Sequence, residues 1–138
     1  MRIDRHLGEL AAAHRLPHHG GMCALLHGHN WDVHAWVEAP VDPATGIAVD
    51  FLDFDAFWKA AMQELDHAVW LAREDPLAGT LQAAGVEMKL VLVDGDPTAE
   101  NMAVVLLGRL RGAFPRGSRW GVRVSEMAGC SAEVVAEE

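Results

Sequence analysis

The sequence Cys23-Ala-Leu-Leu-His-Gly-His-Asn-Trp-Asp-Val-His-Ala-Trp36 decides how the fold is interpreted. Its second half alternates between two kinds of residue, and one side of the alternation carries Trp31, Val33 and Ala35. A period of two residues predicts a half-buried β-strand, which we expect to run to about residue 39. The segment before the strand, which begins at Cys23, is interpreted as a loop that leads into it.

Two histidines stand at the head of this strand. Side chains at i and i+2 of a strand point to the same face, so His27 and His29 should project together on the apolar side, and His34 on the opposite side. Neutral imidazole is a good zinc ligand, and a catalytic zinc commonly has three protein ligands and one open position. The alternative is a strand-end histidine pair without a metal.

A third ligand would best be supplied by His14, at the end of a first strand expected over residues 2–14. This strand could form a hairpin with the second one. His6 is too far from His14 to share a metal with it, since eight residues of extended strand span about 26 Å. His18 and His19 lie in a turn-rich loop and should be solvated. Taken alone, His14 would be interpreted as an ordinary strand-end histidine.

The composition of the whole chain excludes several classes of protein. A length of 138 residues predicts one domain, 1–138, and 51% hydrophobic with 22% charged residues is ordinary for a globular protein. The net charge of -9 argues against nucleic acid as the main partner. No apolar run is long enough to span a membrane and no signal peptide is recognisable, so we expect a cytoplasmic protein. Cys23 and Cys130 should be free thiols.

In the middle of the chain, the spacing of apolar residues changes from that of a strand to that of a helix. Residues 40–46 read as a turn, and the apolar positions between Phe54 and Leu65 then recur with the spacing of an amphipathic helix, for which Asp53 is a reasonable N-cap. Residues 68–85 are undecided, with Pro76 expected to interrupt any helix there. Residues 86–93 are a strand candidate.

The C-terminal third predicts a second helix capped by Thr98, a long strand from Trp120 to Glu126, and a short edge strand after Cys130. Gly8 is a candidate β-bulge in the first strand. Strands at both ends with helices between them predict an α+β fold, with two helices packed on one face of a sheet.

Further residues are candidates for chemistry. Cys23 is either a small buried hydrophobe or, beside two metal ligands, a thiolate base. Cys130 has no such neighbours in the sequence and is interpreted as structural. Asp66 and His67 are either a plain helix C-terminus or a proton relay, in which the acid orients the imidazole. Glu126 shares the apolar side of its strand, where a carboxylate needs a hydrogen-bonding ligand such as one with two N–H donors.

Several motifs occur in an order that resembles the 6-pyruvoyltetrahydropterin synthase family. They are Ala12-Ala13-His14, Cys23-x3-His27-Gly-His29-Asn30, Gly46-x2-Val49-Asp50-Phe51, Leu65-Asp66-His67, Pro97-Thr98-Ala99-Glu100-Asn101 and Glu126. The Cys-x3-His-Gly-His spacing most resembles the bacterial 6-carboxy-5,6,7,8-tetrahydropterin synthases of the queuosine (7-deazaguanine) pathway. The resemblance departs from the family pattern at Trp31, at Leu10 and in the segment after His67.

The resemblance implies a set of roles. Zinc would be bound by His14, His27 and His29, and protons would be transferred by Cys23, Asp66 and His67. The pterin ring would be anchored by Glu126, with help from Thr98 and Glu100. The implied fold is the tunnelling fold, an antiparallel sheet with two helices on one face, whose subunits join into a barrel, commonly as hexamers with active sites between subunits.

The implied activity is that of a zinc-dependent carbon–oxygen lyase, which converts 7,8-dihydroneopterin triphosphate to 6-carboxytetrahydropterin. Two alternatives stay open. One is triphosphate elimination of the 6-pyruvoyltetrahydropterin synthase type, and the other is a zinc-binding protein without catalysis.

Overall fold

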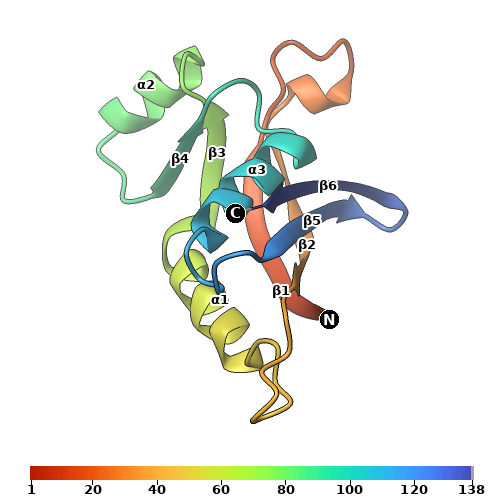
Figure 1. Ribbon diagram of the computed structural model, residues 1–138. Helices are drawn as coiled ribbons and strands as arrows, with labels where there is room; N and C mark the ends of the chain where they lie inside the picture. Colours follow the sequence, from red (N-terminus) through yellow and green to blue (C-terminus); the bar gives the residue numbers. More distant parts are fainter. Residues whose placement is uncertain (138) are drawn as a thin grey trace.

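A computed structural model describes residues 1–137, which form a six-stranded sheet and three α-helices (Figure 1). The strands lie side by side in the order β4-β3-β1-β2-β5-β6. Their bounds are β1 Arg2–His14, β2 His27–Glu38, β3 Ala68–Ala72, β4 Lys89–Val93, β5 Arg119–Met127 and β6 Cys130–Glu137. The helices are α1 Phe51–Leu65, α2 Pro76–Ala83 and α3 Ala99–Leu110, and a short 3-10 helix covers Met22–Ala24.

The α+β class is confirmed, and the sheet is more mixed than expected. β1, β2, β5 and β6 pair antiparallel, whereas β3 pairs in parallel with both β1 and β4. β3 and β4 are five residues each and nearly continuously apolar. Such short parallel strands carry no alternation, which is why the sequence did not predict their pairing.

A bulge at Gly8 divides β1 into two parts, as the sequence indicated. The register against β2 slips between His6 and Gly8, and Gly8 has φ 126, a conformation that favours glycine. Before the bulge, Arg5 reaches Asp55 of α1 with a 2.7 Å ion pair, so the odd-numbered side chains face the helices. After it, Leu10 and the other even-numbered residues are buried. The bulge therefore puts His6 on the sheet face away from α1.

The core lies between the sheet and the helices α1 and α3, which cover the same face (Figure 1). The sheet contributes fully buried side chains that include Leu10, Trp31, Val33, Trp70 and Val122. The helices contribute Phe54 and Leu65 from α1, and Met102, Leu106 and Leu110 from α3. The expectation of two helices on one face is confirmed for these two.

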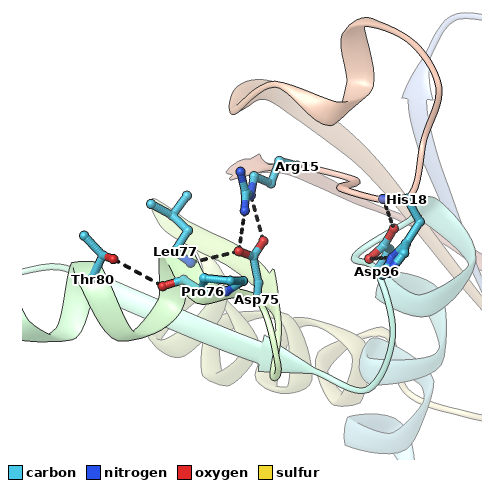
Figure 2. A network of polar contacts seen from close by, with 7 residues as sticks. All are labelled: Arg15, His18, Asp75, Pro76, Leu77, Thr80 and Asp96. Atoms are coloured by element: carbon cyan, nitrogen blue, oxygen red, sulfur yellow. Dashed lines mark hydrogen bonds and ion pairs between the residues drawn. The ribbon is translucent and has the colours of Figure 1, made fainter.

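The third helix, α2, corrects the interpretation of Pro76. The proline occupies the first turn of α2, where its missing N–H costs nothing, and Asp75 caps the helix by accepting from Leu77 N–H. Figure 2 shows that the Asp75 carboxylate also accepts two hydrogen bonds from the guanidinium of Arg15. They come from Nε at 2.7 Å and from Nη2 at 2.5 Å. This contact ties the end of β1 to the start of α2.

The other helix starts are close to those expected. Thr98 caps α3 by accepting a hydrogen bond from Asn101 N–H, as predicted. α1 begins earlier than predicted, because Asp50 rather than Asp53 accepts from Leu52 N–H and acts as the cap. Among residues 1–137, no helix is both long and apolar enough to cross a membrane.

Candidate functional site

Three histidines meet where β1 ends and β2 begins. His14 is the last residue of β1 and His27 the first of β2, and the two are direct partners in the antiparallel ladder. His29 lies two residues further along β2, opposite Ala12. The strand period turns all three side chains toward the helix-covered side, where His14 is 1% exposed.

Backbone carbonyls orient two of the three imidazoles. His14 donates its Nδ1–H to the carbonyl of Pro97 at 2.8 Å, and His27 donates its Nδ1–H to the carbonyl of Leu25 at 2.6 Å. A neutral imidazole carries one proton, so both Nε2 atoms are then left with a free lone pair. These two Nε2 atoms lie 3.1 Å apart. Carbonyl partners of this kind commonly fix the tautomer of metal-ligating histidines.

A proton shared between the Nε2 atoms of His14 and His27 is disfavoured. Burial lowers the pKa of His14, and the neighbouring His27 and His29 lower it further, against the opposing effects of the Pro97 carbonyl and Glu126. His29 adds a buried Nε2 that has no hydrogen-bond partner among the described residues. The site therefore brings together three imidazole nitrogens whose lone pairs a cation could accept.

These residues fit a zinc ion. Zinc–nitrogen bonds of 2.0–2.1 Å at tetrahedral angles separate two ligand nitrogens by about 3.3 Å, close to the 3.1 Å between His14 and His27. The ligating atoms of His14, His27, His29 and Glu126 all lie within 4.8 Å of one another. Metal binds the neutral form of imidazole, and the two carbonyls hold the Nδ1 protons so that each Nε2 points into the cluster.

Glu126 reaches the same cluster from β5. Its Oε1 lies 2.8 Å from Nε2 of His29 and 3.7 Å from Nε2 of His14. The 2.8 Å contact is an ion-pair distance without hydrogen-bond geometry, which leaves the His29 nitrogen unpaired. The carboxylate is 28% exposed and lines two hollows. It can therefore meet either a metal or a bound ligand.

Cys23 lines one of these hollows together with His27, His29 and Glu126. The loop that carries it is fastened to the end of β1, because Leu16 N–H donates to the Cys23 carbonyl at 2.8 Å. The rest of this hollow is lined by four apolar side chains, those of Met22, Leu25, Leu26 and Met127. Cys23 therefore shares a largely apolar hollow with two of the imidazoles.

The second hollow is lined by His14, Thr98 and Glu100 as well as by Glu126. Cys130 also lines it, a position that its sequence neighbours did not predict. Cys130 pairs with Met127 across the tight turn between β5 and β6, and this hairpin brings it back beside Glu126. Its position four residues after Glu126, past Gly129, was the only signal in the sequence.

Asp66 and His67 lie apart from both hollows, in the turn between α1 and β3. His67 donates Nδ1–H to Asp66 at 2.6 Å, and Ala11 N–H donates to the other carboxylate oxygen at 2.9 Å. Burial by itself would raise the pKa of Asp66, but the hydrogen bonds from Ala11 and His67 outweigh it and lower that pKa. The His67 side chain is 80% exposed, so its ring faces outward from the chain.

Comparisons with known proteins agree on one family. The family model of 6-pyruvoyl tetrahydropterin synthase matches residues 3–137. A probable 6-carboxy-5,6,7,8-tetrahydropterin synthase of Halobacterium salinarum is 34% identical over 106 residues, 77% of this chain and 67% of that protein. The 6-carboxy-5,6,7,8-tetrahydropterin synthase of Rickettsia conorii is 29% identical over 109 residues, 78% of this chain and 77% of that protein.

A solved structure gives the same fold. The crystal structure of 6-pyruvoyl tetrahydropterin synthase from Plasmodium vivax superposes with a TM-score of 0.78, at 18% sequence identity, over 100% of this chain and 98% of that one. The match by sequence covers all six strands and all three helices. The chain belongs to the 6-pyruvoyl tetrahydropterin synthase family.

Proposed function

We propose that this chain is a zinc-dependent lyase that converts 7,8-dihydroneopterin triphosphate to 6-carboxytetrahydropterin, a step of the queuosine pathway. The observation that carries the proposal is the convergence of the Nε2 atoms of His14, His27 and His29 beside a hollow lined by Cys23. The names of the Halobacterium and Rickettsia relatives support the 6-carboxy product.

The three histidines would hold the zinc. Bound there, the ion would polarise the side-chain oxygens of the substrate and lower the pKa of its hydroxyls. The Pro97 and Leu25 carbonyls keep the Nδ1 protons of His14 and His27 in place. The rings therefore need no change of tautomer when the ion arrives, which favours a fixed site.

Cys23 would act as the general base. Its thiol shares a hollow with two of the proposed ligands, so a cation there would favour the thiolate. The proton removed from a side-chain carbon of the substrate would pass to Cys23 Sγ and return to a neighbouring position. Triphosphate would leave by elimination. Addition of water and cleavage between the first and second side-chain carbons would then leave the carboxylate on the ring and release the other two carbons as an aldehyde.

Asp66 and His67 would relay the second proton. Asp66 holds the Nδ1–H of His67, so Nε2 of the ring is free to exchange a proton at the outward-facing edge. Because this edge is exposed in the single chain, the relay would complete a site on a neighbouring copy. This arrangement suits a homo-oligomer in which subunits join their sheets into a barrel, and by family resemblance we propose a hexamer.

Glu126 would anchor the pterin. A cyclic guanidine edge offers two N–H donors, and a carboxylate accepts both in one charge-assisted contact. Thr98 and Glu100 line the hollow next to Glu126 and would contact the same ring. The ring would then lie in the hollow beside His14, with its side chain directed toward the histidines.

The product mass tests this proposal. The zinc-loaded chain is incubated with 7,8-dihydroneopterin triphosphate, and the pterin product is measured by mass spectrometry, with zinc content determined on the same sample. A 6-carboxy product supports the proposal. A product that keeps the three-carbon side chain identifies pyruvoyl-type elimination, in line with the human relative named 6-pyruvoyl tetrahydrobiopterin synthase. Full zinc occupancy with no turnover identifies a non-catalytic zinc-binding protein.

A further inference from the structure

A second histidine cluster lies on the opposite face of the sheet. His6 donates from Nε2 to Asp32 Oδ1 at 2.5 Å, and His34 donates from Nε2 to Asp32 Oδ2 at 3.0 Å. The two rings stack with centroids 4.5 Å apart and an interplanar angle of 24°. Two imidazoles and one carboxylate therefore converge from β1 and β2, outside the site built around His14.

The bulge at Gly8 creates this cluster. His6 and His14 are both even-numbered residues of β1, and in a regular strand they would share a face. The register slip between His6 and Gly8 turns His6 to the face away from α1, where it lies directly opposite His34. Asp32 and His34 share that face because they are two residues apart in β2.

The donor set is one that binds divalent cations. Imidazole nitrogen and carboxylate oxygen are both zinc ligands, with bond lengths of about 2.0–2.2 Å. The three ligating atoms of the cluster already lie within 4.8 Å of one another, so small side-chain rotations bring them to the separation that a tetrahedral ion needs. All three side chains are partly exposed, which leaves a path for the ion and a position for water.

The charges around the cluster do not oppose a cation. Glu9 is the ladder partner of Asp32 and adds a negative charge on the same strand pair, whereas Arg123 of β5 is the ladder partner of His34 and adds a positive one. Arg123 is itself opposite Glu133 of β6, which offsets that charge. A divalent ion at the cluster would therefore not face a net positive surface.

We propose that His6, Asp32 and His34 form a second cation site, which takes Zn²⁺ or a chemically similar first-row divalent ion. It binds more weakly than the His14 site, because its side chains are more exposed and already satisfied by hydrogen bonds to one another. The site gives the chain a second zinc equivalent that is independent of the proposed reaction.

The test counts zinc in a chain that carries no histidine tag. Removing His27 disables the other site, so the experiment is done on the His27→Ala variant, stripped with a chelator and dialysed against Zn²⁺. One equivalent per chain should remain bound, and it should disappear in His27→Ala/His34→Gln. Asp32→Asn in the same background should weaken Zn²⁺ binding at least tenfold, since even an outer partner of a ligand is worth about 10–100-fold.

Two matched controls separate this site from scattered surface histidines. His18 also pairs with a single aspartate, Asp96, so His18→Ala in the His27→Ala background should keep the equivalent. Asp4→Asn removes a carboxylate from the same strand and should keep it as well. No zinc bound to His27→Ala, or an equivalent that survives His34→Gln, would overturn the proposal and leave a hydrogen-bonded triad. Circular dichroism of each variant verifies that it is folded.

Discussion

The Nε2 atoms of His14 and His27 lie 3.1 Å apart, while each ring donates its Nδ1–H to a backbone carbonyl. Two nitrogen lone pairs at this distance repel unless a cation lies near both. Because burial lowers the pKa of His14, a shared proton is disfavoured, whereas the metal ion that we propose would accept both lone pairs. The strand ladder that pairs these residues thus also positions the side chains of the proposed metal site.

The substitution His27→Ala should abolish tight zinc retention, because two imidazoles rarely hold a catalytic zinc. Metal content after chelator treatment and gel filtration, which also remove the weaker equivalent proposed for His6, Asp32 and His34, checks this outcome by mass spectrometry. His19→Ala is the matched control, since the exposed His19 side chain accepts a hydrogen bond from Gly21 N–H within its own loop and lies outside the histidine cluster. Tight zinc in His27→Ala, resistant to a chelator, would show that the ligands lie elsewhere.

The substitution Cys23→Ala should reduce turnover by about 10²–10⁴-fold, the range of a general base, while zinc content stays at the parent level. The thiol lines the hollow beside His27 and His29, so the change removes the base without removing a ligand. Single-turnover kinetics with zinc content measured on the same sample check both parts. Loss of the metal instead would make Cys23 a ligand.

The alternation of side chains along a strand made the histidine cluster predictable from the sequence. His14, His27 and His29 fall on one side and His34 on the other because the period of a strand is two residues, and the structure agrees at each position. The sequence also placed the cap of α3 at Thr98. These are local features, set by neighbouring residues.

What escaped prediction depends on contacts between distant segments. Pro76 reads equally well as the end or the first turn of a helix, and only the capping of α2 by Asp75 decides between them. The approach of Cys130 to the hollow depends on the register of the last hairpin. The Pro97 carbonyl that orients His14 lies 83 residues away from it in the sequence, so no local pattern predicts this contact.

The substitution Asp75→Asn should lower the free energy of unfolding by about 1–3 kcal/mol at pH 7, because it weakens a charged hydrogen bond to Arg15 at a buried carboxylate. Denaturant unfolding checks this. Asp94→Asn is the matched control, since its pair with Arg73 is exposed and should contribute no more than about 0.5 kcal/mol.

The same pair predicts a pH dependence. The hydrogen bond from Arg15 lowers the pKa of Asp75, against the opposing effect of burial. A group whose pKa is lower in the folded state stabilises the fold fully above its unfolded pKa of about 3.9. The difference between parent and Asp75→Asn should therefore be constant from pH 5 to pH 8 and shrink as the pH falls below about 4. A difference that grows on acidification would contradict the ion pair.

The substitution Gly121→Ala should destabilise the chain by about 1–3 kcal/mol, the usual cost of overpacking. An added Cβ would lie 2.5 Å from Cε2 of Trp36, whose ring contacts the guanidinium groups of Arg2 and Arg119 and donates its Nε1–H to Glu133. Thermal unfolding checks the effect. Gly108→Ala, where a Cβ meets nothing within 4 Å, is the matched control and should not destabilise.

The substitution Glu126→Gln separates two roles for one carboxylate. Oε1 of Glu126 lies 2.8 Å from Nε2 of His29, so it is close enough to act as a fourth metal ligand as well as a pterin anchor. Glutamine keeps the shape but loses the charge and turns an amide donor toward the donors of the ligand. Pterin binding should weaken by roughly 2–4 kcal/mol, the cost of a buried polar mismatch at a charged contact, while zinc content stays unchanged.

Calorimetry with a non-reactive pterin, on zinc-loaded protein, measures the effect of Glu126→Gln on pterin affinity. Glu100→Gln is the control, because Glu100 lines the same hollow but is not part of the histidine cluster. Its effect on pterin affinity should be smaller, because Glu100 is not part of the group of ligating atoms that lie within 4.8 Å of one another and is expected to assist rather than to anchor. If Glu126→Gln loses zinc together with pterin, the carboxylate is a metal ligand. If it binds pterin as tightly as the parent, the ring is anchored by other residues and the pterin assignment loses its main support outside the histidine cluster.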